Sequence, residues 1–323
     1  MPLENDLDKV LIIGSGPTLI GSVAEMDLMA TEAIDALTEE GIQVVLVNPN
    51  PATISTDKRP DVTVYLEPMT LDFLKRILRM EEPNAIITAY GSTNGLKVAH
   101  KLLQDGILKQ MGIQLLTLNS KTLQMGDQQK RTDFLEKLGV KTSKSWELNQ
   151  RIPDNLNITP EELKQRIAFP VLVTKYNRFV HNEHLRFKDP VALIAYFRNE
   201  SQNDNFTWKN YRLIEDLSAW EKIIVDVIRD KDGNLVFINF AGSVESVAIN
   251  SGDSAVVMPS LTLNNDHIQE LREEIKRITD KLDLVGFASF HFAIKHHGTQ
   301  IKSKLLTIRP RLTRSSVWAQ RIG

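Results

Sequence analysis

Residues 286–316 read G-F-A-S-F-H-F-A-I-K-H-H-G-T-Q-I-K-S-K-L-L-T-I-R-P-R-L-T-R-S-S, and this stretch decides the fold. It contains two apolar runs, 287–294 and 301–308, on either side of His297 and Gly298. Two strand-like runs joined by a short segment with glycine predict a β-hairpin. The stretch therefore predicts antiparallel sheet in the second half of the chain.

The residues before this stretch repeat the pattern. A second pair of apolar runs, 223–228 and 234–240, flanks Asp232 and Gly233, a strong hairpin signal. Between the hairpins, apolar residues recur at spacings of three and four, namely Ile268, Leu271, Ile275, Ile278 and Leu282. This period is typical of an amphipathic helix. Hairpins beside a long helix predict an α+β unit.

The first part of the chain has a different pattern. Short apolar runs at 9–13, 43–47, 62–66 and 85–89 alternate with helical patterns at 25–40, 71–80 and 96–103. Strands that alternate with helices predict an α/β, Rossmann-like unit, an open parallel sheet with helices on both faces. We expect one domain over 1–119 and a second over 120–323, which begins with a helix over 120–139.

A glycine motif follows the first predicted strand. Gly14, Gly16 and Gly21 invite a dinucleotide-binding interpretation, but their spacing differs from the dinucleotide fingerprint. The alternative is a tight strand-to-helix turn that needs a positive φ. We favour the turn.

Composition limits the function classes. The chain has 323 residues, 42% hydrophobic, and its 39 Lys and Arg nearly balance 41 Asp and Glu. This balance predicts no nucleic acid and no membrane as partner. The absence of cysteine excludes disulfides and thiolate chemistry. No signal peptide is visible, so we expect a cytoplasmic protein.

Several motifs together resemble one family. They are G-S-G-P at 14–17, N-P-N-P-A-T-I-S-T-D at 48–57, A-Y-G-S-T-N-G-L at 89–96, S-G-D-S at 251–254 and R-L-T-R-S-S at 311–316. In this order they resemble the first half of the carbamoyl-phosphate synthase large subunit. The resemblance implies a pre-ATP-grasp domain over 1–119 and a two-lobed α+β ATP-grasp domain over 120–323. The small lobe would lie within 120–215, and the large lobe would be 216–323.

The resemblance also implies where metal ions would bind. The family holds two Mg²⁺ ions with Gln, Glu and Asn side chains, and these positions correspond to His291, Thr307 and Arg309. Mg²⁺ prefers oxygen ligands, and imidazole is a poor substitute. We therefore expect no Mg²⁺ at these positions.

The nucleotide-binding positions that the resemblance implies are Glu215, Leu217, Lys222, Asn250, Thr174, and Gln129 or its neighbour Lys130. Glu215 and Leu217 keep the family's residues near adenine, and Arg311 keeps a catalytic arginine. The other positions carry residues that differ from the family's. Thr174 and Gln129 are found where the family has phosphate-binding arginines, Lys222 where it has a ribose-binding carboxylate, and Asn250 where it has a histidine. ATP binding is therefore expected to be weak at most.

Three function classes remain open. The first is a catalytically degenerate homologue that acts as a binding or regulatory protein. The second is an active ATP-dependent ligase that forms carboxyphosphate or carbamoyl phosphate with altered nucleotide binding. The third is a metabolite sensor. Expected partners are a small-molecule anion or nucleotide, a second copy of the chain, or a synthase-type subunit. Arg309 is either an ordinary ion-pair partner or an anion-binding group.

Overall fold

The computed structural model describes residues 7–16, 24–88, 90, 93–116, 118–125, 128–148, 152–153, 156–175, 183–203, 206–247 and 254–322. The chain forms two compact units. The first consists of residues 1–141, 221–245 and 249–323, and the second of 142–220 and 246–248. No helix in these described ranges is both long and apolar enough to cross a bilayer.

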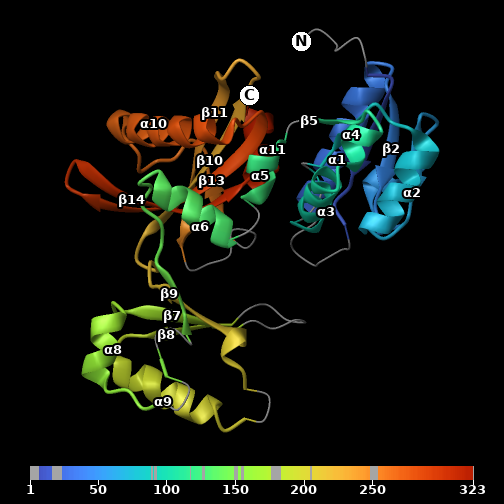
Figure 1. Ribbon diagram of the computed structural model, residues 1–323. Coiled ribbons are helices and arrows are strands. Elements are labelled where there is room, and N and C mark those ends of the chain that lie inside the picture. The colour runs from blue at the N-terminus through green and yellow to red at the C-terminus, as the bar shows by residue number, and fades with distance from the viewer. Residues whose placement is uncertain are drawn as a thin grey trace. The chain divides into compact units, whose positions relative to one another are not determined.

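The first unit begins with a parallel sheet (blue to blue-green in Figure 1). Its strands are β1 (Lys9–Ile13), β2 (Gln43–Val47), β3 (Val62–Tyr65), β4 (Ala85–Ile87) and β5 (Gln114–Leu116). The order is β3-β2-β1-β4-β5, and every neighbouring pair is parallel. The Rossmann-like sheet expected from the sequence is therefore confirmed.

Helices cover both faces of this sheet. The connecting elements are α1 (Ala24–Glu39), η1 (Ile54–Thr56), α2 (Leu71–Glu81), α3 (Thr93–Gln104) and α4 (Ile107–Gln110). Ile34 of α1 packs with one set of sheet side chains. Leu74 of α2 and Leu102 of α3 pack with the other set, which points to the opposite face.

The first unit also contains a second sheet, whose central strands are antiparallel. Its strands are β10 (Glu221–Arg229), β11 (Leu235–Ser246), β12 (Val256–Val257), β13 (Gly286–His297) and β14 (Gln300–Arg309), in the order β12-β11-β10-β13-β14. Three helices belong to this part, α5 (Ser120–Gln124), α6 (Gln128–Lys137) and α10 (Asn265–Leu282), and α11 (Arg314–Ile322) follows β14. Leu135 of α6 and Ile275 of α10 pack with Phe290 in one buried core, so both helices cover the same face.

The second unit is a smaller α+β structure (Figure 1). Its sheet contains β6 (Ser145–Glu147), β7 (Val171–Lys175), β8 (Glu183–Phe187) and β9 (Tyr211–Glu215) in the order β6-β9-β7-β8. The helices α8 (Pro160–Arg166) and α9 (Pro190–Glu200) and the turn η2 (Trp208–Asn210) complete it. Phe197 is fully buried and meets the Tyr211 ring edge-on, with centroids 5.5 Å apart.

One segment differs from its prediction. The helix expected over 120–139 is two helices, α5 and α6, and α5 ends at Gln124. Gly126, in the sequence between them, has the weakest helix propensity in the segment apart from the terminal Gly139. Two other predictions are confirmed. The amphipathic helix expected over 268–282 is α10, and the two expected hairpins turn at Gly233 and Gly298, which both have a positive φ.

We predict that Ile275→Ala lowers the free energy of unfolding by about 2–5 kcal/mol, because truncation of a buried isoleucine leaves a cavity. Ile275 is fully buried in the core under α10. Glu273→Ala, an exposed position on the same helix, is the matched control and should change stability little. Urea denaturation measures both. Equal effects of the two substitutions would contradict the helix orientation.

Candidate functional site

Polar side chains gather on the face of the second sheet that points away from α6 and α10. We call this the polar face and define it by Lys222, Asp226, Ser289, His291, Thr307 and Arg309. Residues directly opposite each other on paired strands point to the same side. The adjacent residues on the three strands, such as Val225, Phe290 and Ile308, lie in the core. Strand alternation therefore separates a wholly apolar face from a polar one.

The strand register fixes which polar groups are neighbours. Asp226 pairs with Ser289, and Ser289 pairs with Arg309, so these three residues form one row across β10, β13 and β14. In the next row, His291 lies opposite Thr307. A register shift between His291 and Phe292 marks a β-bulge. Bulges often re-aim side chains beside functional sites.

His291 is at the centre of a positively charged environment. Its side chain is 3% exposed, and its Nε2 atom has no hydrogen-bond partner in the described part of the chain. Burial is the largest cause that holds the pKa of His291 well below its ordinary value. The positive charges of Arg309, Lys222 and Arg311 lower this pKa further. His291 is therefore a neutral imidazole at neutral pH.

Lys222 experiences the same environment. It is 4% exposed, near the start of β10. Burial lowers the pKa of Lys222, the charge of Arg309 lowers it further, and Glu245 opposes both. The expected nucleotide position Lys222 is thus a buried amine whose charged form is disfavoured.

Asp226 is the buried acid of the polar face. Its exposure is 0%, and its Oδ1 atom accepts a hydrogen bond from the Thr313 hydroxyl at 3.4 Å. Burial raises the pKa of Asp226, while neighbouring hydroxyls and the charge of Arg309 oppose the rise. The Oδ2 atom has no hydrogen-bond partner among the residues that the structure describes.

The donor set at the expected metal positions does not fit Mg²⁺. It consists of an imidazole at His291, a hydroxyl at Thr307 and a guanidinium at Arg309. Mg²⁺ takes oxygen ligands, commonly one or two carboxylates, and an arginine cannot be deprotonated to become a ligand. The positive charges that lower the pKa of His291 would also repel a divalent cation.

The run that contains Arg311 has a structural role at its far end. The hydroxyls of Thr313 and Ser315 lie 2.8 Å apart beside Asp226, and the Thr313 N–H donates to Ser316 Oγ at 2.9 Å. Arg311 is half-buried and donates from Nη1 to the carbonyl oxygen of Leu312 at 3.1 Å. The R-L-T-R-S-S motif therefore anchors the start of α11 at the polar face.

The second unit holds three of the expected nucleotide positions. Thr174 on β7 is 4% exposed, and its hydroxyl lies 3.0 Å from Nδ1 of His184. Glu215, at the end of β9, accepts a hydrogen bond from the N–H of Lys144 at 3.1 Å, and Leu217 is buried. The contacts of Thr174 and Glu215 are with residues of the same unit, so they contribute to the packing of that unit.

Two expected positions cannot be placed in full. Asn250 lies outside the described residues. The backbone of Gln129 belongs to α6, but its side chain is outside the described part. Lys130 is exposed on α6 and lines a cavity beside His100 of α3.

Asp226 was not predicted as a site residue, although a signal exists. It is the one charged residue in the run I-I-V-D-V-I at 223–228. A charge within a buried strand needs polar partners, and this one has them in residues 313–316 far along the sequence. Ser289, within an apolar strand, carries the same signal.

Comparison with known proteins identifies the fold and then the family. Solved structures with the same fold include the ADP complex of an N5-carboxyaminoimidazole ribonucleotide synthetase (TM-score 0.67, 15% identity, 97% of this chain and 72% of that chain). The biotin carboxylase domain of a thermophilic 2-oxoglutarate carboxylase is also similar (TM-score 0.65, 16% identity, 96% and 65%). These are ATP-grasp proteins, and the chain shares their fold.

Two family models cover nearly the whole chain. The carbamoyl phosphate synthase preATP-grasp domain matches residues 6–125, and the ATP binding domain of the carbamoyl-phosphate synthase L chain matches 127–323. The chain belongs to the carbamoyl-phosphate synthase large-chain family. This confirms the family resemblance found in the sequence.

Curated relatives agree with the family models. The carbamoyl phosphate synthase large chain of Agathobacter rectalis is 33% identical over 99% of this chain. The corresponding large chain of Clostridium perfringens is 32% identical, also over 99%. This chain spans only 29% of the length of each of these relatives.

We predict that His291 makes stability depend on pH. The pKa of His291 is lower in the folded state than in the unfolded state, where it is about 6.5. At a pH below about 6.5 the unfolded chain therefore binds a proton at this side chain and the folded chain does not. Stability should therefore fall as pH falls from about 7 to 5, by up to about 1.4 kcal/mol per pH unit from this group.

His291→Gln should remove this part of the slope, whatever it does to absolute stability. His297→Gln, at the exposed end of the second hairpin, is the matched control and should leave the slope unchanged. Urea denaturation at a series of pH values measures both slopes. An unchanged slope in His291→Gln would contradict the proton exclusion at this site.

Proposed function

We propose that this chain is a catalytically degenerate member of the large-chain family that binds an anionic ligand instead of forming carboxyphosphate with Mg²⁺ and ATP. The observation that carries the proposal is the positive environment of His291. Arg309, Lys222 and Arg311 all lower the pKa of this buried side chain. A face that disfavours one additional proton also disfavours a divalent metal ion.

The same charges favour an anion. Arg309 stands at a position that the resemblance assigns to a metal ligand, and its guanidinium presents hydrogen-bond donors suited to carboxylate or phosphate. Lys222 adds a second cation on the same face. A bound anion would offset the mutual repulsion of these groups. The ligand class is therefore a phosphate-bearing or carboxylate-bearing molecule, a nucleotide included, whose binding needs no Mg²⁺.

Partner assembly is a separate proposal. The relatives are named large chains, and this chain spans a minority of their length. A second copy of this chain and a synthase-type subunit both stay predictions. Exposed apolar side chains support such an association, with Leu261 81% and Val244 65% exposed.

We predict that a nonhydrolysable ATP analogue binds no more tightly with Mg²⁺ than with EDTA. Arg309→Met should weaken binding about 10-fold or more, because a charge-assisted hydrogen bond contributes about 1.5–3 kcal/mol. Lys302→Met, an exposed cation on the same strand β14, is the matched control. Isothermal titration calorimetry measures each affinity. Binding that requires Mg²⁺, or an equal loss in both variants, would overturn the proposal.

We also predict no bicarbonate-dependent release of ADP from ATP. The double substitution Thr307→Glu and Arg309→Asn should not restore it, because phosphoryl transfer depends on several groups that act together. Thr174 would still occupy a phosphate-binding arginine position. A coupled ADP assay, with a full-length large chain as positive control, tests this. Bicarbonate-stimulated turnover in the unaltered chain would establish the ligase alternative instead.

A further inference from the structure

A cavity of about 570 Å³ lies within the first unit, away from any residue of the polar face as defined above. Its lining comes from α3, from the segment that leads into α2, and from α5 and α6. Its apolar side includes Met69, Leu71, Leu96 and Leu123. The volume is within the range of about 300–1,000 Å³ that small-molecule sites occupy.

The polar side of this cavity is basic. Lys97 and Lys101 of α3 and Lys130 of α6 line it, and all three are exposed. No acidic side chain lines it in the described part of the chain. Asn94 at the start of α3 and Gln104 at its end also line the cavity and contribute uncharged amide groups. The electrostatics favour an anionic ligand.

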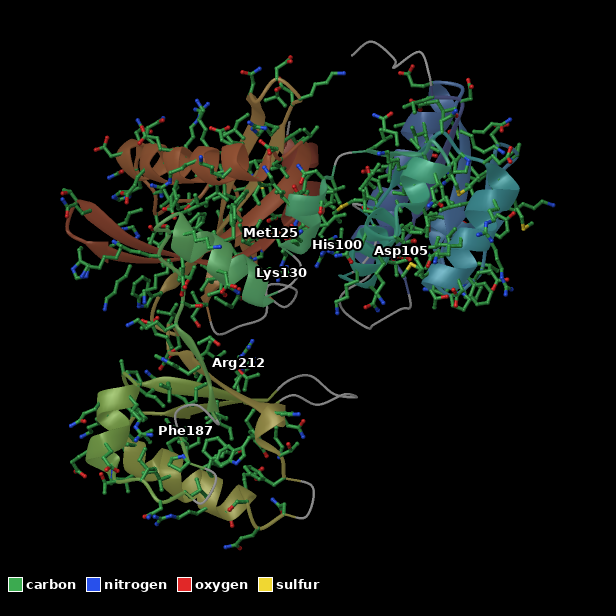
Figure 2. All side chains as sticks on the ribbon, viewed as in Figure 1. His100, Asp105, Met125, Lys130, Phe187 and Arg212 are labelled. Atoms are coloured by element: carbon green, nitrogen blue, oxygen red, sulfur yellow. The ribbon has the colours of Figure 1, made fainter. Side chains whose placement is uncertain are left out.

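His100 gives a second, independent indication of a ligand. It lines the cavity from α3, and Figure 2 labels it together with Lys130. Both ring nitrogens are buried, and neither has a hydrogen-bond partner among the described residues. An unsatisfied buried polar group is destabilising by about 1–3 kcal/mol, so retention of this one needs a reason. Burial and the charge of Lys130 both lower the pKa of His100.

We propose that this cavity binds a small organic anion, with its carboxylate or phosphate group among Lys97, Lys101 and Lys130 and its apolar body against Leu71, Leu96 and Leu123. Because both ring nitrogens of His100 are covered in the free protein, the ring would turn to donate or accept a hydrogen bond at the bound molecule. This site is additional to the polar face and takes its own ligand. Because the lining joins α3 of the parallel-sheet part to α5 and α6, the ligand stabilises the packing between them.

Phenyl phosphate and benzoate are suitable probes, with benzyl alcohol as the neutral control of similar size. We expect one or both anions to shift the imidazole C–H proton NMR signals of His100, which are assigned by their loss in His100→Gln. Binding should also raise the pKa of His100, because a nearby anion stabilises the imidazolium form. The two anions distinguish a phosphate-binding site from a carboxylate-binding one.

Lys130→Gln should weaken binding of the preferred anion about 10-fold, as the loss of one charge-assisted contact predicts. Lys137→Gln is the matched control, because Lys137 is exposed on the same helix but does not line the cavity. Both substitutions are at exposed positions and should fold. The proposal is overturned if neither anion moves the His100 signals up to about 10 mM. Equal binding of benzyl alcohol, or equal loss in both variants, also overturns it.

Discussion

The register of β10, β13 and β14 is the constraint on which the polar face depends. Asp226, Ser289 and Arg309 share one row, and His291 lies opposite Thr307 in the next. A shift of one residue would exchange this set for the core residues Val225, Phe290 and Ile308. The large core beneath α6 and α10 therefore fixes the chemistry of the opposite face.

The positive charges that act on His291 come from three side chains, Arg309, Lys222 and Arg311. The apolar core and the hydroxyl-bearing anchor at residues 313–316 hold this part of the chain together. The resemblance found in the sequence assigns a metal-binding amide to the position of Arg309 and a ribose-binding carboxylate to that of Lys222. Together with Arg311 these two side chains lower the pKa of His291, as burial also does. The apolar core, by contrast, lies on the other side of the sheet.

Much of the fold could be predicted because its signals are local. The 268–282 periodicity predicted α10, and glycine at 233 and 298 marked both hairpins. Short strands such as β5 and β12 were missed, because their pairing is set by distant residues. The division into α5 and α6 was missed although Gly126 is a local signal for it. Asp226 and His100 were also missed. The role of Asp226 depends on partners far along the sequence, and that of His100 on hydrogen-bond partners that the described residues do not supply. Both facts become visible only in the folded chain.

The central claim is that the polar face excludes a divalent cation. Electron paramagnetic resonance of Mn²⁺, titrated into the protein with a nonhydrolysable ATP analogue, tests it most directly. Free and nucleotide-bound Mn²⁺ spectra without protein provide the reference. We predict that the spectrum with protein shows no further bound Mn²⁺ species. The reason is that the three expected metal positions, His291, Thr307 and Arg309, contain no carboxylate and carry a net positive charge. A stoichiometric protein-bound Mn²⁺ signal that disappears in His291→Ala would contradict the account.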